Sequence, residues 1–467
     1  MKVELSLNLE TKKSATILVV SAYEQGQQPG TVATAAAIFE GNGHHVISLD
    51  LSHEGLSDVD LSDVDVLAIS CAMHTGTRLG LEFAAKSKAR NPNLLVIGYG
   101  LYASLMADRK GSEYAVDLWV GGEFEAALGE VSSNLADGIS RDISRIDGMG
   151  TTPKFDRAGH IVPNRIGLKP PAYYGGVRRL DGNVPVGAVE ATRGCAHTCL
   201  HCPIPSVYEG KLRLVSPEIV LEDIENHIGH GARHITFTDP DFFNAVPHSF
   251  EILHEMRRRH PEITFNATIK VEHLIEYEHR LPEMRDLGCL FITSAFESLN
   301  DDILDRLQKG HTSQDLELAL RIGNEIDIPI IPTWLPFTPW TSLEDMQTLL
   351  RFVYEHDLVS RTPPIQYAIR LLVPPRSLLE DVLRDENRLL EFDDSKLSFK
   401  WENPEVDDLQ EDIMKIVVDS HDSHLETSIA DIFEQIWISV FKDTEPVPKR
   451  QAETDDFVPG LIEAWFC

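Results

Sequence analysis

The sequence of 467 residues has no apolar run long enough to cross a membrane, and it contains only six cysteines. A membrane-spanning helix needs about 20 consecutive apolar residues, so we expect no membrane span. Residues 1–13 also lack the apolar centre of a secretory signal peptide. We therefore expect a cytoplasmic protein whose cysteines ligate a metal rather than form disulfides in that reducing compartment.

Basic residues are scarce relative to acidic ones. The chain has 42 Lys and Arg against 74 Asp and Glu, a formal net charge of −32. An acidic surface repels phosphate backbones and anionic membranes, so we expect no nucleic-acid partner. Hydrophobic residues make up 42% and charged residues 25%, which is ordinary for a globular protein. The length predicts two or three domains.

Residues 1–137 alternate strand-like and helix-like patterns. Buried-strand runs lie at residues 15–22, 45–51, 64–70, 94–98 and 115–120, and helical patterns lie at 30–41, 79–89 and 124–135. This alternation predicts a doubly wound, Rossmann-like α/β domain with a parallel sheet. Ligands of such sheets bind beyond the carboxyl ends of the strands.

Small and polar residues gather at the predicted strand ends of this domain. The candidate binding residues there are Ser70, His74, Gly98, Gly100, Gly122 and Glu123. Glycine at such positions lets the backbone approach a large ligand closely, although a glycine at any one of them can also be a simple turn residue. Several such loops on one edge favour a binding face.

Residues 138–184 are rich in Gly, Pro and Arg and are predicted to be a linker. A second alternating series occupies residues 185–382. Its strand runs lie at 186–191, 235–238, 264–269, 290–295, 328–334 and 367–373, and its helical patterns at 217–228, 249–259, 272–287, 313–325 and 342–354. Six such units predict a partial (β/α)6 barrel of TIM type, with its chemistry at the carboxyl ends of the strands. Residues 383–467 predict a small helical C-terminal cap.

Three cysteines follow the first strand of the barrel series. Cys195, Cys199 and Cys202 have the spacing C-x3-C-x2-C. Three thiolates can hold three irons of a [4Fe–4S] cluster and leave the fourth iron open. The alternative is a zinc site with His197 or His201 as the fourth ligand, but structural zinc sites usually use two separated ligand pairs, and no second pair lies nearby. The spacing therefore favours the cluster.

This cysteine triplet at the end of a first barrel strand resembles the radical S-adenosylmethionine (radical SAM) superfamily, over about residues 185–380. The resemblance implies that S-adenosylmethionine chelates the open iron and is cleaved to a 5′-deoxyadenosyl radical. It also implies an external electron donor such as flavodoxin or ferredoxin. The family usually has an aromatic residue just before the third cysteine. Here His201 takes that place, and its ring can still stack on an adenine.

Other cofactor contacts follow from the same resemblance. Asp239, Asn266, Glu297 and Arg370 lie at the ends of the second, third, fourth and sixth predicted strands. Each is a candidate contact to S-adenosylmethionine, and each taken alone is about as well explained by a structural role. The remaining cysteines in apolar strand contexts, Cys71 and Cys289, are predicted to be small core residues.

A doubly wound domain ahead of such a barrel resembles the cobalamin-binding class of the superfamily. The resemblance implies a corrin lying across the strand ends that carry Ser70, His74, Gly98, Gly100, Gly122 and Glu123. The Asp-x-His-x-x-Gly signature of other cobalamin proteins is absent after the first strand, so we expect no histidine from that loop on the cobalt. The alternative is a degenerate domain that binds nothing.

The chain ends in Trp465-Phe466-Cys467. This end resembles a branch of the class that terminates in Cys-Sec-Ala-Glu-Pro or Cys-Cys-Ala-Glu-Pro. The resemblance implies a selenoprotein truncated at a selenocysteine codon, with Cys467 as a catalytic residue. The alternative is a frayed terminus with an idle thiol. A UGA stop followed by codons for Ala-Glu-Pro is the expected gene sequence.

The leading functional hypothesis is a cobalamin-dependent methyltransferase acting on an unactivated carbon or a phosphinate of a small-molecule or peptide substrate. One alternative is a radical cyclase, oxidase or rearrangement enzyme that transfers no methyl group. Another is a non-catalytic cobalamin or iron–sulfur sensor, which the absence of a basic recognition helix disfavours. A methylthiotransferase acting on transfer RNA is disfavoured by the acidity of the chain.

Overall fold

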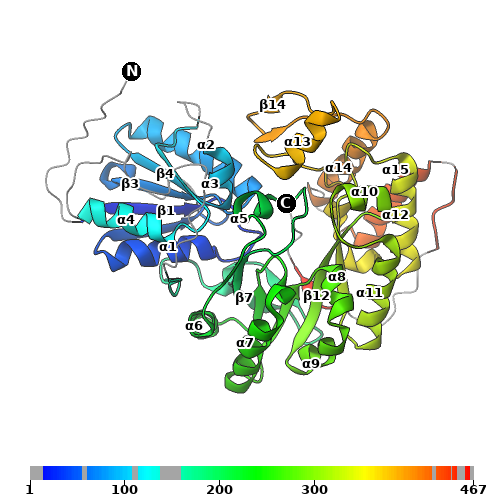
Figure 1. Ribbon diagram of the computed structural model, residues 1–467, viewed down its shortest axis with the longest axis horizontal. Coiled ribbons are helices and arrows are strands. Elements are labelled where there is room, and N and C mark those ends of the chain that lie inside the picture. The colour runs from blue at the N-terminus through cyan, green and yellow to red at the C-terminus, as the bar shows by residue number, and fades with distance from the viewer. Residues whose placement is uncertain are drawn as a thin grey trace. The chain divides into compact units, whose positions relative to one another are not determined.

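The structure is a computed structural model that describes residues 14–54, 60–107, 114–136, 159–422, 427–442, 444–449 and 458–462. The chain divides into two compact units (Figure 1). The first comprises residues 1–170 with 206–209 and 395–397, and the second comprises residues 171–205, 210–394 and 398–467. Each unit is described by itself below.

The first unit is built on a parallel sheet of five strands in the order β2-β1-β3-β4-β5. The strands are β1 (Thr16–Ser21), β2 (His45–Asp50), β3 (Val66–Ser70), β4 (Leu95–Gly100) and β5 (Leu118–Gly121). The helices are α1 (Gly30–Gly41), α2 (His74–Arg90), α3 (Leu101–Met106) and α4 (Glu125–Ala136). Helices α1 and α4 lie on one face of the sheet and α2 and α3 on the other (Figure 1). The predicted Rossmann-like fold is confirmed, with a strand order typical of flavodoxin-like sheets.

The strands of this sheet form because their apolar runs are buried on both faces. All residues of β3 and β4 are buried, as is nearly all of β1. Near-continuous Val, Ile and Leu runs are typical of parallel strands between two helical layers. The core under α1 and α4 includes Val19, Val66, Ile97 and Val120.

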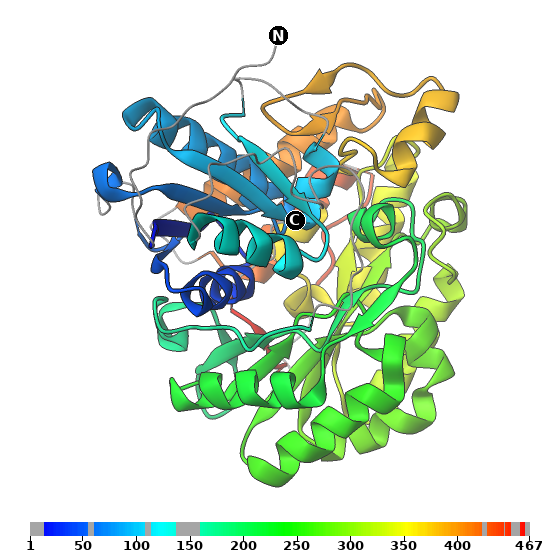
Figure 2. The same ribbon diagram turned by 60° about the vertical axis from the view of Figure 1, so that its left-hand side comes forward.

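The second unit is built on a sheet in the order β13-β12-β11-β10-β7-β6-β16. Its parallel strands are β7 (Val184–Val189), β10 (His234–Phe237), β11 (Thr264–Thr268), β12 (Cys289–Glu297) and β13 (Ile330–Trp334). Strands β6 (Gly176–Arg178) and β16 (Gly460–Leu461) extend it as antiparallel edge strands. The covering helices are α6 (Pro217–Gly229), α7 (Val246–Arg259), α8 (Val271–Glu276), α9 (Leu281–Asp286), α10 (Asp301–Arg306), α11 (Ser313–Glu325) and α12 (Leu343–Glu355). This curved, helix-covered sheet confirms the predicted partial barrel (Figure 2).

Two predicted elements of the barrel are wrong in detail. The sixth strand predicted at residues 367–373 is reduced to one isolated parallel bridge between Phe337 and Arg370, preceded by the 3-10 helix η8 (Pro364–Tyr367). Prolines flank this segment, and proline cannot donate to a strand ladder. The helix predicted at 272–287 is broken into α8, η6 (Glu278–Arg280) and α9, because Pro282 cannot continue a helix from the preceding turn.

The remaining elements lie around and beyond the barrel strands. Strands β8 (Thr192–Gly194) and β9 (Leu212–Leu214) pair next to α5 (Pro203–Tyr208). The C-terminal region contains α13 (Leu378–Asp385), the antiparallel pair β14 (Phe392–Asp393) and β15 (Ser398–Phe399), α14 (Asp407–Asp422) and α15 (Ile429–Phe441). This region is mostly helical as predicted, although the β14–β15 pair was not expected. Among the described residues, no helix is both long and apolar enough to cross a membrane.

Candidate functional site

The three cysteines lie in the loop that joins β8 to α5. Cys195 and Cys199 are buried and Cys202 is partly buried. Burial raises the pKa of Cys202 to about 12, and the neighbouring charges of Cys199 and Cys195 add to this effect. The three thiols lie within one loop of eight residues. A bound iron centre would supply the positive charge that keeps such thiols ionised, so the residues present fit an iron–sulfur cluster.

Asn244 and Leu307, both outside the cysteine loop, hold it by three hydrogen bonds. The Asn244 side chain donates to the Cys195 sulfur at 3.3 Å, and its oxygen accepts from the backbone N–H of Ala196 at 3.3 Å. The backbone N–H of Leu200 donates to the carbonyl oxygen of Leu307 at 3.0 Å. Asn244 lies in the 3-10 helix η5 (Phe242–Ala245) that follows β10. The loop is thus positioned by the neighbouring strand end and not by its own sequence alone.

Predicted site residues His201 and Glu297 are brought together. The Nε2 atom of His201 lies 3.2 Å from Oε1 of Glu297, and Lys309 Nζ donates to the same oxygen at 3.1 Å. Burial would raise the pKa of Glu297, but the charges of Lys309 and His201 outweigh it and lower the pKa well below its usual range. Burial alone would lower the pKa of Lys309, yet the Glu297 charge raises it. Beside the cysteine loop there is therefore a buried, ionised carboxylate–ammonium pair.

The backbone of Glu297 is strained. Its φ is +64°, and the pairing of β12 with β13 shifts register between Ala295 and Glu297. A non-glycine residue in this left-handed region costs on the order of 1–3 kcal/mol and is typical of functional sites. Sequence reasoning missed Lys309, because one lysine in a loop after α10 has no periodic signal.

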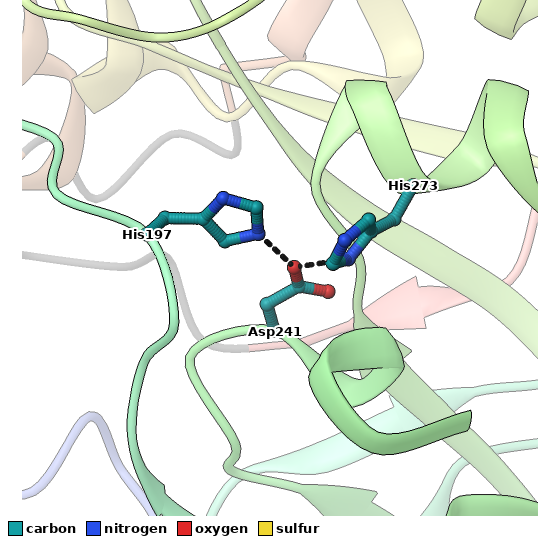
Figure 3. Close-up of side chains that lie close together, drawn as sticks. All are labelled: His197, Asp241 and His273. Atoms are coloured by element: carbon teal, nitrogen blue, oxygen red, sulfur yellow. Dashed lines mark hydrogen bonds and ion pairs between the residues drawn. The ribbon is translucent and has the colours of Figure 1, made fainter. Parts of the chain in front are cut away.

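A second cluster, missed as a unit by the sequence analysis, surrounds Asp241 (Figure 3). Nε2 of His197 lies 3.1 Å and Nδ1 of His273 lies 2.7 Å from the same oxygen, Oδ2 of Asp241. Burial would raise the pKa of Asp241, but its contacts with His197 and His273 lower it to about 2. Lys270 Nζ lies 3.2 Å from the other ring nitrogen of His197 and 2.9 Å from Oε2 of Glu272. His197 itself comes from the cysteine loop.

Asp239 and Asn266 make contacts inside the fold. The Asp239 carboxylate accepts from the backbone N–H of Ala191 at 3.0 Å and from the Thr192 hydroxyl at 2.6 Å. Burial raises the pKa of Asp239 to about 7. The Asn266 Oδ1 atom accepts from the Thr236 hydroxyl at 2.7 Å and lies 2.9 Å from His234 Nε2. Asp239 thus anchors the chain just before the cysteine loop, and Asn266 joins a buried polar network between β10 and β11.

Arg370 contacts residues of the C-terminal region, and its expected contact with S-adenosylmethionine stays a prediction. Its guanidinium donates to Asp407 Oδ1 at 2.6 Å and to the Trp401 carbonyl oxygen at 2.7 Å. It also lies 3.5 Å from the centroid of a Trp401 ring. These contacts link the Arg370 side chain to the C-terminal region through an ion pair and a stacked ring.

The first unit brings several of its predicted residues to one sheet edge. Ser70, Gly100 and Gly122 lie at or just after the ends of the adjacent strands β3, β4 and β5. The Ser70 hydroxyl donates to Oε1 of Glu24 at 3.1 Å, and burial raises the pKa of Glu24 to about 7. The φ value of 106° at Gly100 requires glycine, and the value of 67° at Gly122 favours it.

The other residues predicted at this edge have different surroundings. His74 begins α2, and its Nε2 lies 2.6 Å from the carbonyl oxygen of Lys396 in the same unit. Glu123 lies 3.9 Å from His160. Gly98 lies within β4 and not in a loop, and a Cβ atom there would come 2.5 Å from the Trp119 ring. Close packing against Trp119 favours glycine at this position, and a ligand contact of Gly98 stays a prediction.

The cysteines outside the loop divide into two groups. Cys71 and Cys289 are buried, and burial raises the pKa of both thiols, to about 12 for Cys71. Such thiols are unreactive, in agreement with their predicted core role. Cys467 lies outside the described residues, so its catalytic role stays a prediction.

A protein-family model matches most of the barrel strands and helices. Residues 189–353 match the family described as the radical SAM superfamily. The chain is 24% identical over 263 residues to bacteriochlorophyllide d C-12(1)-methyltransferase of Chlorobaculum tepidum, covering 54% of this chain and 52% of that protein. It is 24% identical over 309 residues to hopanoid C-3 methylase of Methylococcus capsulatus, covering 62% and 59%. The chain thus spans little more than half the length of these curated relatives.

Solved structures agree on the fold. TsrM from Kitasatospora setae, a radical S-adenosylmethionine methyltransferase with cobalamin and a [4Fe–4S] cluster bound, matches with a TM-score of 0.55 and 17% identity, covering 74% of this chain and 70% of that chain. The cobalamin-dependent S-adenosylmethionine radical enzyme OxsB matches with a TM-score of 0.61 and 14% identity, covering 92% and 72%. At such low identities the likeness establishes the fold alone.

Proposed function

We propose that this chain, which carries a radical SAM domain over residues 189–353, is a cobalamin-dependent radical SAM methyltransferase. The observation that carries the proposal is the loop of Cys195, Cys199 and Cys202 beyond the first parallel strand of the barrel, in a chain that also has a Rossmann-like unit. A [4Fe–4S] cluster held by these thiolates, with S-adenosylmethionine on its open iron, supplies a 5′-deoxyadenosyl radical.

The residues around the loop have positioning roles in this proposal. Asn244 donates to the Cys195 sulfur and holds the backbone at Ala196, which orients the first ligand. His201 takes the place of the usual aromatic residue, and its contact with Glu297 sets the direction of its ring. Glu297 in turn is held by Lys309. Because these side chains are already oriented, little conformational entropy is lost when the cofactor binds.

We further propose that the first unit binds cobalamin at the carboxyl ends of β3, β4 and β5. The support is the position of Ser70, Gly100 and Gly122 at adjacent strand ends, where open α/β sheets bind their ligands. The named cofactors of TsrM and OxsB, whose folds are similar, point to the same group. His74 and Glu123 border this edge and are the side chains that would contact the corrin from α2 and from the β5 loop.

The proposed substrate is a small molecule or a peptide. Curated relatives are named as methylases of a bacteriochlorophyllide and of hopanoids, and one TsrM structure contains tryptophan. The acidic chain disfavours a nucleic acid. A flavodoxin or ferredoxin in the cytoplasm is the proposed electron donor.

The proposal is tested by anaerobic reconstitution with iron, sulfide and hydroxocobalamin, followed by assay for 5′-deoxyadenosine and S-adenosylhomocysteine under reduction. We expect both products, and loss of both in Cys199→Ala. Deoxyadenosine without S-adenosylhomocysteine would instead indicate a radical cyclase, oxidase or rearrangement enzyme. Neither product, with zinc in place of iron at the cysteines, would overturn the proposal.

A further inference from the structure

The cluster of His197, Asp241 and His273 has the composition of a metal site. The three side chains come from three separate elements: the cysteine loop, the N-terminal end of η5, and helix α8. Their nearest nitrogen and oxygen atoms all lie within 4.8 Å of one another. Two imidazoles and one carboxylate are the protein ligands of many catalytic zinc sites and of non-haem iron sites. The radical SAM chemistry proposed above does not use them as a set.

The distances between these atoms suit coordination to one ion. Around a metal with bonds of about 2.1 Å, neighbouring ligand atoms are ~3.0–3.4 Å apart. His197 Nε2 lies 3.1 Å from Asp241 Oδ2, within that range, and His273 Nδ1 lies 2.7 Å from the same oxygen, which is shorter than that range. Both rings approach the same oxygen, from either side (Figure 3). All three atoms lie within 4.8 Å of one another, so small movements of the rings would let them share one ion.

The Asp241 carboxylate is oriented so that Oδ2 alone faces the rings. Its other oxygen, Oδ1, accepts from the backbone N–H of Phe243 at 3.2 Å and from that of Lys270 at 3.4 Å. These backbone contacts fix the carboxylate plane before any ligand binds. Hydrogen bonds to the second oxygen are typical of a carboxylate that ligates a metal through one oxygen.

The orientation of His273 suits a metal ligand. Its Nδ1 atom is only 2.7 Å from Oδ2, yet it is buried and lacks a partner in hydrogen-bond geometry. The ring nitrogen therefore lies beside the oxygen without pointing at it. A nitrogen and an oxygen that share an ion adopt this relation, because each points at the metal and not at the other.

The ammonium group of Lys270 lies on the far side of the His197 ring from Asp241. Lys270 Nζ faces Nδ1 of His197, whereas Nε2 of His197 faces Asp241. Lys270 is also paired with Glu272 at 2.9 Å. A metal-bound imidazole usually donates its other N–H to a carboxylate. Glu272 Oε2 lies 3.9 Å from His197 Nδ1, so a carboxylate stands near that nitrogen.

We propose that His197, Asp241 and His273 bind a divalent transition-metal ion, separate from the iron of the cysteine loop. His197 contributes Nε2, Asp241 contributes Oδ2 and His273 contributes Nδ1. Three protein ligands leave at least one position for water or a ligand oxygen, as in catalytic zinc sites. The inference stands on these side chains and does not depend on S-adenosylmethionine cleavage.

Zinc titration of the full chain with its cluster assembled tests the inference, because iron then occupies the three thiols. We expect one Zn²⁺ per chain by anaerobic calorimetry and by elemental analysis after desalting. His273→Ala and Asp241→Asn should each weaken binding by at least ~10-fold. His254→Ala is the matched control, because His254 also pairs with a carboxylate, Glu283 at 2.8 Å, but is exposed. It should bind Zn²⁺ like the unchanged chain.

Folding and ligand type are checked separately. Circular dichroism must match the unchanged chain, and His273→Gln replaces His273→Ala if the latter unfolds. Co²⁺ bound at the proposed site should give ligand-field bands without the intense charge-transfer absorption of cobalt thiolates. That absorption would appear only if Co²⁺ bound the cysteines, so the spectrum distinguishes the two sites in a chain that assembles no cluster. Two results would reject the metal site: equal Zn²⁺ binding by His273→Gln and the unchanged chain, or no Zn²⁺ binding by the chain with its cluster assembled. In either case the three side chains would form only a hydrogen-bonded ion pair. Formation of deoxyadenosine in that case would leave the proposed function standing.

Discussion

A buried ammonium beside the cysteine loop shows how much depends on single residues. Lys309 is 4% exposed and Glu297 is 9% exposed, so both charges are largely removed from solvent. Lys309→Met should leave the Glu297 carboxylate buried without its cation, at a cost of about 3–5 kcal/mol in the free energy of unfolding. Denaturant unfolding of the cluster-free chain measures this cost.

The paired variant Lys309→Met with Glu297→Gln gives the control for that measurement. It removes both charges, so much of the lost stability should return. If the single variant is as stable as the unchanged chain, the two groups are not the coupled pair that their 3.1 Å contact indicates. Loss of stability in both variants to the same extent would point to packing and not to charge.

Glu24 predicts a pH dependence of stability in the first unit. Its folded pKa is about 7 against an ordinary value of 4.5, chiefly because it is buried. A raised folded pKa means that the unfolded state loses its proton first. Stability from this group is therefore full below pH 4.5 and falls as the pH rises towards 7. Glu24→Gln should raise stability at pH 8 by up to about 3 kcal/mol and leave it nearly unchanged at pH 4.5.

Thermal unfolding of Glu24→Gln across that pH range is the measurement. The amide oxygen of glutamine can still accept from the Ser70 and Thr31 hydroxyls that contact Glu24. Glu82→Gln, at an exposed position on α2, is the control and should show no such trend. If Glu24→Gln changed the unfolding temperature by the same amount at every pH, the pKa of the Glu24 carboxyl would not differ between the folded and unfolded states.

At the scale of elements, the pairing of β4 with β5 depends on a glycine. Gly98 lies beside Trp119 in the register of the two strands, and an added Cβ would come 2.5 Å from the indole ring. Gly98→Ala should therefore destabilise the chain by about 1–3 kcal/mol through overpacking. Trp119→Leu combined with Gly98→Ala should recover part of that loss. Denaturant unfolding of Gly98→Ala, of Trp119→Leu and of the double variant measures these losses. If the losses of the two single variants simply add in the double variant, the Trp119 ring does not cause the effect of Gly98→Ala.

The sequence predicted most elements well where periodicity was strong. The predicted spans of α1 and α11 agree with the structure at both ends, because apolar spacing is supported by a Thr312 capping box in α11 and by a turn at Gly43 after α1. Predictions failed where proline competed with the period, as in the broken helix at Pro282. The short helix α3 and strand β6 were missed because elements of six and three residues show too little repetition.

At the scale of the whole molecule, the two units divide the proposed cofactors between them. The cysteines belong to the second unit, and Ser70, Gly100 and Gly122 belong to the first. Cys199→Ala in the full chain should therefore abolish deoxyadenosine formation and still bind hydroxocobalamin. Absorbance of the desalted protein measures bound cobalamin. Loss of cobalamin in Cys199→Ala, with the circular dichroism unchanged, would mean that the corrin site needs the iron–sulfur loop.

Local sequence determined the fold class, the cysteine loop and the strand ends that carry the first unit's candidate residues. These features follow from the periodicity of apolar residues and from spacings of a few residues, and both patterns are present in the sequence itself. Only the tertiary structure decided which side chains meet. His201 and Glu297 are 96 residues apart, and Cys195 and Asn244 are 49 apart. Such contacts, like the convergence of three elements on Asp241, arise from packing between elements and leave no periodic trace in the sequence.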